Sequence, residues 1–262
     1  MKRSLQSFAI AAFLLLSASS TFAQIGLKFT AFMLPQYVTM RNADDVAAQV
    51  KDDNAYKYEP WGGMAAGGYI GYNANETFGL RTGVLFSRQG YQWSSKRNAN
   101  DRNNYYTRLD YMKIPLMMGL STRHTGNKTV FSFYAGYQLG FLTNVRCWDD
   151  VMEYVPPISD NISAFPRKYN TYNFYNGSIV AETGFDVTLM RELSMNIRFR
   201  GDYSLRDAEN KSVVYRLTDN GETVNVKYWD GFHGGALRRA SHNITAGLLL
   251  GVTYNIIPEE YK

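Results

Sequence analysis

Apolar and polar residues alternate along much of the chain with a period of two, which is the spacing of a β-strand. In LSMNIRFRGDYSL, residues 193–205, most odd positions carry large apolar side chains, whereas the even positions include two arginines and an aspartate. Similar patterns predict eight strands, at 24–34, 61–73, 77–93, 107–122, 129–144, 176–190, 193–205 and 241–257. Many of these exceed the five or six residues usual in soluble proteins and can cross a bilayer at a tilt.

The connections between these strands alternate in length. Short turns are expected at 74–76, 123–128 and 191–192, and long loops rich in charge, Asn and Tyr at 35–60, 94–106, 145–175 and 206–240. An even number of strands with short turns at one end and long loops at the other is typical of outer-membrane barrels. The predicted fold class is all-β: an eight-stranded antiparallel up-and-down transmembrane β-barrel with short periplasmic turns and long extracellular loops.

Alternation alone also fits a soluble barrel of the lipocalin kind, which would point its large apolar face inward. Strand length and loop asymmetry favour the membrane form, in which this face contacts lipid and the lumen holds polar and small side chains. Aromatic residues near strand ends are expected to form interfacial girdles. They are Trp61, Tyr91, Trp93, Tyr105, Tyr106, Tyr111, Tyr172, Tyr175 and Tyr203.

The first residues indicate the compartment. Lys2 and Arg3 precede an apolar run at 8–16 and small residues ending at Ala23, the layout of a cleavable secretory signal. We expect 1–23 to be a signal peptide and 24–262 to form one outer-membrane β-barrel domain. Export and the barrel pattern together predict localisation in the outer membrane.

Composition narrows the function classes. Removing the signal leaves 26 basic residues against 23 acidic ones, and no Lys/Arg run or zinc-ligand spacing accompanies this mild excess, so nucleic acid is not an expected partner. The single cysteine, Cys147, excludes an intramolecular disulfide. Aromatic residues make up 15% of the chain, which suits strands and membrane interfaces.

The predicted inward face carries charges of both signs. An eight-stranded barrel is just wide enough for its own side chains, and unpaired buried charges cost several kcal/mol each. We therefore interpret these residues as a structural polar cluster, with Glu182 facing Arg200 across a hairpin. The alternative interpretation is a selective pore. The expected cluster comprises Lys28, Arg81, Lys113, Glu182, Asp186, Arg198, Arg200 and Asp202.

Catalytic, cofactor and metal sites are not predicted. The histidines do not fall into a nucleophile, base and orienter pattern, and the paired loop carboxylates lack the other ligands of a calcium loop. These residues are His124, His233, His242, Asp52-Asp53 and Asp149-Asp150. Arg238-Arg239 near the outer rim could pair with lipopolysaccharide phosphates.

Two strands carry a family resemblance. GLRTGVLFSRQGY, residues 79–91, and YMKIPLMMGL, residues 111–120, resemble the PorT-like outer-membrane β-barrel family of the Bacteroidota. Its third strand typically reads G-x-x-x-G-x-x-Y-S-x-x-G and its fourth Y-L-E-I-P-L-L-L, so Lys113 stands where an acidic residue is usual. GVTYNI, residues 251–256, resembles the last-strand signal read by the barrel-assembly machinery. The resemblance implies an eight-stranded outer-membrane barrel, and the family's namesake takes part in type IX protein secretion.

Together these features predict a non-enzymatic outer-membrane protein that acts through its extracellular loops. It would serve as an envelope component or as an accessory subunit of an outer-membrane complex, with protein secretion as one such role. The alternatives are a narrow porin-like barrel for ions or small solutes and a lipid A or peptide hydrolase. Expected partners are outer-membrane lipid and lipopolysaccharide, the barrel-assembly machinery during biogenesis, and other outer-membrane or secretion proteins.

Overall fold

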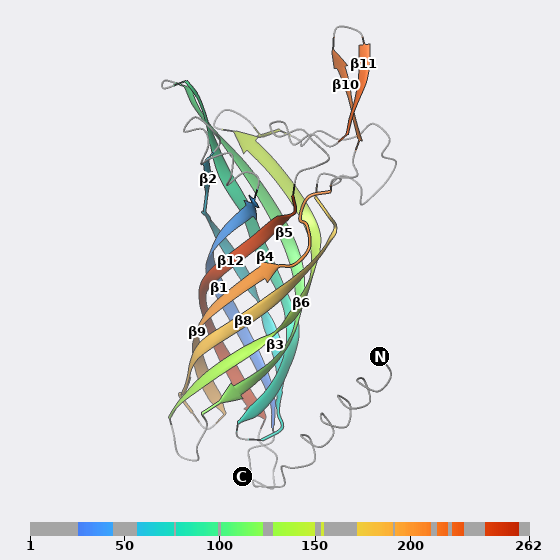
Figure 1. The fold of residues 1–262 in the computed structure, drawn as a ribbon. Helices are drawn as coiled ribbons and strands as arrows, with labels where there is room; N and C mark the ends of the chain where they lie inside the picture. The colour runs from blue at the N-terminus through green and yellow to red at the C-terminus, as the bar shows by residue number, and fades with distance from the viewer. Residues whose placement is uncertain are drawn as a thin grey trace, which may run out of the picture.

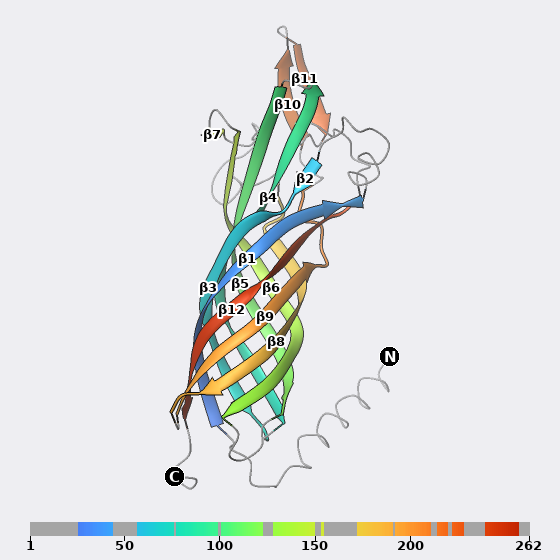
Figure 2. The same cartoon turned by 90° about the vertical axis from the view of Figure 1, so that its left-hand side faces the viewer.

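The protein forms an all-β barrel in a computed structural model (Figures 1 and 2). The structure describes residues 26–43, 57–75, 77–98, 101–122, 128–149, 153–154, 172–190, 192–210, 214–219, 222–227 and 239–256. The barrel strands are β1 (Gly26–Asn42), β3 (Trp61–Asn73), β4 (Phe78–Asn98), β5 (Asp101–Ser121), β6 (Thr129–Asp149), β8 (Tyr175–Thr188), β9 (Leu193–Ser204) and β12 (Ser241–Ile256). Four shorter strands are β2 (Lys57–Glu59), β7 (Glu153–Tyr154), β10 (Val214–Asp219) and β11 (Glu222–Lys227).

The eight long strands close into a ring. Each pairs antiparallel with its neighbours along the chain, and β1 also pairs with β12, from Leu27 opposite Ile256 to Asn42 opposite Ser241. Within the ring, both edges of every long strand are paired with a neighbouring strand. The predicted fold class is confirmed. β2 adds to β4, β7 adds to β6, and β10 with β11 forms a separate hairpin.

Most of the large apolar side chains on the described barrel strands point away from the lumen. Phe86 on β4 and Leu116 on β5 are 63% and 67% exposed, whereas the inward Leu85 and Lys113 are at most 2% exposed. This is the orientation of a barrel surrounded by lipid and the opposite of a soluble barrel. No helix in the described part of the chain is long and apolar enough to span a membrane.

Several strands extend further than the alternation predicts. The range 61–73 coincides with β3, but β1 continues past Pro35 to Asn42, and its register with β12 skips Leu34 and Pro35. Proline has no N–H to donate to the ladder, so pairing with β12 is interrupted at this point. The pairing resumes on both sides, and the strand continues. The expected loop at 94–106 is wrong: β4 and β5 run through it as a paired hairpin. Its sequence is mostly polar and lacks the alternation of apolar and polar residues that marks a strand.

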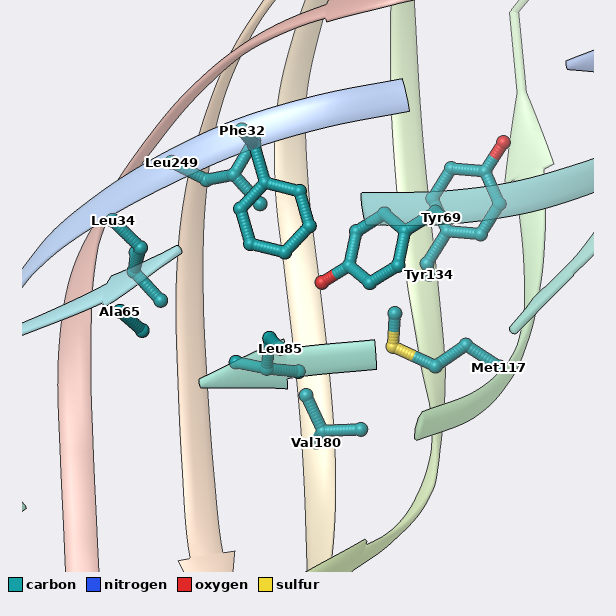
Figure 3. Close-up of a cluster of buried hydrophobic side chains, with 9 residues drawn as sticks. All are labelled: Phe32, Leu34, Ala65, Tyr69, Leu85, Met117, Tyr134, Val180 and Leu249. Atoms are coloured by element: carbon teal, nitrogen blue, oxygen red, sulfur yellow. The ribbon is translucent and has the colours of Figure 1, made fainter. Parts of the chain in front are cut away.

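The lumen is more apolar than expected. Side chains from seven strands pack into one cluster inside the barrel (Figure 3), made of Phe32, Leu34, Ala65, Tyr69, Leu85, Met117, Tyr134, Val180 and Leu249. A second cluster holds Met40, Tyr91, Leu109, Tyr111, Leu142, Tyr172 and Ala208. The expectation of a lumen filled only with polar and small side chains is therefore wrong.

Three tyrosines expected in the interfacial girdles belong to this second cluster. Tyr91, Tyr111 and Tyr172 are buried inside the barrel, and the hydroxyls of Tyr91 and Tyr172 are hydrogen-bonded at 2.9 Å. Tyr203, in contrast, is 38% exposed on the outer surface. A narrow barrel needs bulky side chains to fill its interior at protein density, and tyrosine supplies volume together with a polar group that finds a partner.

Candidate functional site

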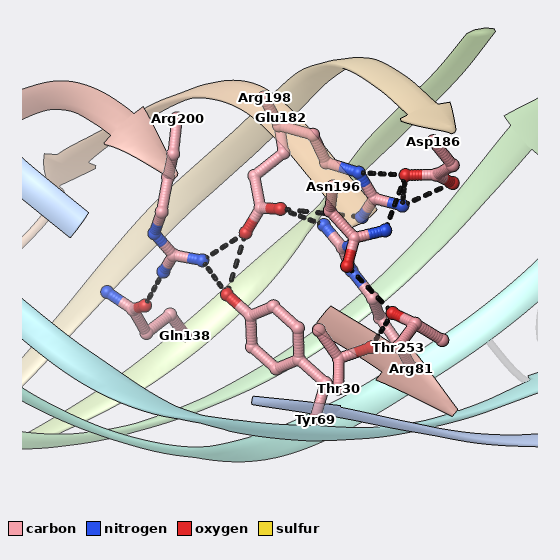
Figure 4. Close-up of polar contacts among 10 residues, drawn as sticks. All are labelled: Thr30, Tyr69, Arg81, Gln138, Glu182, Asp186, Asn196, Arg198, Arg200 and Thr253. Carbon is pink, nitrogen blue, oxygen red and sulfur yellow. Dashed lines mark hydrogen bonds and ion pairs between the residues drawn. The ribbon is translucent and has the colours of Figure 1, made fainter. Parts of the chain in front are cut away.

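The charged residues predicted for the lumen all lie on inward-facing positions of their strands. Figure 4 shows five of them, Arg81, Glu182, Asp186, Arg198 and Arg200. β8 and β9 contribute Glu182, Asp186, Arg198, Arg200 and Asp202, while β1, β4 and β5 contribute Lys28, Arg81 and Lys113. The β8–β9 register pairs Glu182 with Arg200, Gly184 with Arg198 and Val180 with Asp202, the alignment that the sequence predicts. A short turn after Thr188 fixes which residues of β8 and β9 lie opposite one another. Side chains two residues apart on a strand point to the same face.

Glu182 is the centre of the cluster. Its carboxylate is ion-paired with the guanidinium groups of Arg81 and Arg200, and Nη1 of Arg198 lies 3.9 Å from Oε2. The Tyr69 hydroxyl donates to Oε1 at 2.7 Å. With three cations and one hydroxyl around a fully buried carboxylate, Glu182 links β4, β8 and β9 across the lumen.

Arg200 extends this network to two further strands. One Nη atom donates to the Tyr69 hydroxyl at 2.5 Å on β3, and the other donates to the Gln138 side-chain oxygen on β6. Because Arg200 and Glu182 are each only 1% exposed, water cannot replace these bonds. The planar guanidinium therefore connects strands that are distant in sequence through hydrogen bonds and an ion pair.

A second ion pair joins Arg198 to Asp186. Nε and Nη2 of Arg198 donate to Oδ1 at 3.0 and 2.6 Å, and Nη2 also contacts Oδ2 at 2.7 Å. The Asn196 amide donates to the same Asp186 oxygen at 2.7 Å. The guanidinium carbons of Arg81 and Arg198 lie 3.7 and 5.0 Å from the centroid of the Tyr134 ring. A ring face stabilises each of these cations.

A third ion pair, between Lys113 and Asp202, lies apart from Glu182. Lys113 Nζ donates to the two carboxylate oxygens of Asp202 at 2.9 and 3.1 Å, and both side chains are at most 3% exposed.

The predicted charged set leaves out uncharged partners of the cluster, among them Tyr69, Tyr134 and Gln138. Tyr134 and Gln138 lie on the polar face of β6, so alternation alone places them in the lumen. Tyr69 carries no such signal, because β3 is rich in Gly and Ala and its two faces look alike. Its position depends on pairing with β1 and β4, which only the folded barrel specifies.

A small cavity remains on the short-turn side of the cluster. It has a volume of about 30 Å³ and is lined by polar side chains that include Lys28, Arg81, Asp186 and Asn196. Because roughly 10–15 Å³ of such space suffices for one water, the cavity has room for at least one water molecule. The described lumen can thus hold bound water, while its charged pairs and the nine-residue apolar cluster fill the section between the two ends.

The other candidate residues do not assemble into a reactive site where the structure describes them. His242 Nδ1 lies 2.8 Å from the backbone carbonyl of Ser204, and its ring stacks on Tyr203. No described group of three or more His, Cys, Asp or Glu residues is arranged to hold a metal. His124, His233, Asp52-Asp53, Asp150, Arg238 and the side chains of Cys147 and Asp149 lie outside the described part. The Arg239 carbonyl accepts a bond from Asn42 at 2.6 Å.

Comparison with known proteins agrees with this architecture. A family model described as "Outer membrane protein beta-barrel domain" matches residues 18–210. No curated protein sequence matches the chain significantly.

Solved barrels are similar in fold but distant in sequence. OprG from Pseudomonas aeruginosa is 9% identical, with 90% of this chain and 98% of that one covered and a TM-score of 0.44. The outer membrane protease OmpT from Escherichia coli is 9% identical, with 91% and 99% covered and a TM-score of 0.41. The N-terminal barrel domain of OprF from Pseudomonas aeruginosa is 10% identical, with 90% and 100% covered and a TM-score of 0.37. At these values the neighbours carry no argument about function.

Proposed function

Since the chain belongs to the family of outer membrane protein beta-barrel domains, we propose that it is a closed, non-enzymatic outer-membrane barrel that acts through its long-loop end. It serves as an envelope component or as an accessory subunit of a larger outer-membrane complex, including one for protein secretion. The short turns face the periplasm in this arrangement, and the long-loop end faces outward.

The observation that carries this proposal is the length of β4, β5 and β6. Each has 21 residues, or about 70 Å of strand, against a hydrocarbon core of roughly 30 Å. Among the side chains that the structure describes, the exposed large apolar ones on β4 end at Phe86, and those on β5 begin after Asp110. The remaining strand, including the hairpin that joins β4 to β5, extends beyond this band (Figure 2).

The projecting hairpin suits a contact surface better than a membrane segment. Its residues from 94 to 104, SSKRNANDRNN, are polar except for Ala99, and the backbone is paired from Ser94 opposite Asn104 to Asn98 opposite Asp101. Backbone pairing orders the hairpin before a partner binds, so binding costs less conformational entropy than it would with a free loop. Polar, preorganised surfaces of this kind are suited to protein recognition.

The packed lumen argues against conduction as the main role. Buried ion pairs and apolar side chains occupy the described lumen, and removing any one of them would leave charges unpaired or a void. The polar cavity near the short turns is the one observation that favours a narrow porin-like barrel. This cavity ends at the Glu182 cluster, whose side chains fill the lumen beyond it.

A hydrolase role has less support still. The His242 Nδ1 atom is engaged with a backbone carbonyl and not with a serine hydroxyl or a carboxylate. A general base needs its ring nitrogen within hydrogen-bond reach of the group that it deprotonates.

The proposal is tested by shortening the hairpin. Gln92 and Tyr106 are cross-strand partners, so replacing residues 93–105 by Asn-Gly retains a closed barrel with a two-residue turn. A control variant carries an unrelated polar hairpin of the original length. We expect both variants to fold with normal heat-dependent gel migration, and proteins that co-purify with the wild type in mild detergent to be lost from both. Recovery of the wild-type chain alone under several detergents, or unchanged co-purification with both variants, would contradict the proposal.

A further inference from the structure

The outer wall of the barrel carries a basic patch where its apolar band ends. We define the patch as Arg88 on β4, Arg108 and Asp110 on β5, and Arg146 on β6. Cross-strand pairing sets Arg88 opposite Asp110 and Arg108 opposite Arg146, so these residues form two adjacent rows over three neighbouring strands. Three positive charges and one negative charge are thus gathered on one part of the wall.

The contacts within the patch leave donors available. Nε and Nη2 of Arg108 donate to the Asp110 carboxylate at 2.9 Å each, so this aspartate is mainly neutralised by Arg108. Arg88 is further away, with Nε at 3.4 Å from Oδ1 and a side chain that is 55% exposed. Arg146 is exposed. The guanidinium of Arg88 therefore has donors facing outward that a phosphate can accept in a bidentate manner.

A cleft adjoins the patch on the side of the apolar band. It has a volume of about 290 Å³, and its lining includes Met64, Ala66, Phe86 and Thr143 together with Arg88 and Asp110. Ala66 pairs with Phe86, which pairs with Met112, and this row lies one pleat below the row of Arg88. The small Ala66 side chain between larger neighbours creates the hollow.

We propose that the patch and cleft bind one phosphorylated glycolipid of the outer leaflet. A phosphate would lie against Arg88 and Arg146, and an acyl chain would occupy the cleft over Ala66 beside Phe86. Such a ligand matches the site at both ends. Its anionic group lies beside the excess positive charge of the patch, and its hydrocarbon lies beside the exposed apolar side chains of the cleft. Surface charges at this depth are only partly screened by water and salt.

Binding is tested with purified diphosphorylated lipid A added to the whole protein in detergent micelles, followed by native mass spectrometry. Arg88→Gln with Arg146→Gln is expected to lower the affinity at least tenfold. The matched control, Arg41→Gln with Arg206→Gln, removes two exposed arginines elsewhere on the same end and should leave the affinity within twofold of wild type. Neither pair should alter heat-dependent gel migration. Equal losses in both pairs, or none in either, would overturn the proposal.

The cleft is tested separately by filling it. Ala66→Trp should weaken lipid A binding severalfold, whereas Ala181→Trp, on the outward face of β8, should not. Dephosphorylated lipid A should bind the wild type at least tenfold more weakly, and inorganic phosphate should fail to compete at equal concentration. Phosphate competing as well as lipid A would show an anion site without the lipid specificity proposed, and unchanged binding by Ala66→Trp would exclude the cleft.

Discussion

Replacing Glu182 by glutamine should destabilise the barrel more than replacing Arg200 by glutamine. Removing one partner of a buried ion pair costs about 3–5 kcal/mol, because the other charge is left uncompensated. Glu182→Gln leaves both Arg81 and Arg200 without their shared carboxylate, so we expect a loss near 5 kcal/mol at the top of that range. Arg200→Gln leaves Glu182 paired with Arg81, so we expect about 3 kcal/mol.

The double variant isolates the interaction between the two side chains. Glu182→Gln with Arg200→Gln should be more stable than the sum of the single losses predicts, by about 1–3 kcal/mol. The recovery is only partial because Arg81 also loses its ion pair with Glu182 in the double variant. Equilibrium unfolding by urea in phospholipid vesicles measures the three free energies, and the loss of the faster-migrating gel form on heating gives a second readout. Losses that add within about 0.5 kcal/mol would refute the reasoning.

Further predictions follow from the same structure. Asp202→Asn should cost about 3–5 kcal/mol in urea unfolding, and pairing it with Lys113→Met should restore most of the loss, since that ion pair has no other carboxylate in contact; a double variant no more stable than the single would contradict this. Gly90→Ala should lower the free energy of unfolding by about 1–3 kcal/mol, because φ is +148° and a Cβ would lie 1.9 Å from a backbone oxygen of the paired strand; wild-type stability would disprove the constraint. An epitope inserted between residues 99 and 100 should be labelled on intact cells and one at Asn127 should not, and external labelling at Asn127 would invert the topology.

The barrel and its inward charges could be predicted because lipid imposes a strict alternation. Where a strand is surrounded by hydrocarbon, its outward residues must be apolar, so the register of Glu182 and Arg200 follows from sequence spacing and one short turn. The hairpin at 94–106 lies beyond the apolar band, where both faces of a strand can be polar. Without that constraint, the sequence of a strand there resembles that of a loop.

The apolar part of the lumen was hidden for a different reason. Ala31, Phe32, Met33 and Leu34 are consecutive apolar residues, so the pattern does not tell which of them face lipid. The structure places Phe32 and Leu34 inside and Met33 outside. This assignment depends on the pairing of β1 with β3 and β12, which brings together residues from both ends of the chain. Such long-range pairing cannot be inferred from a local pattern.

Planar-bilayer recording tests most directly whether the described lumen is closed. Purified protein, shown to be folded by its heat-dependent gel migration, is inserted into a bilayer beside an open porin as a positive control. The buried ion pairs of Glu182 and Asp202 and the apolar cluster around Leu85 leave no continuous aqueous path through the described lumen, so we expect no unitary conductance steps from the wild type across about ±100 mV. Reproducible single-channel steps that scale with the amount of inserted protein would contradict the closed barrel.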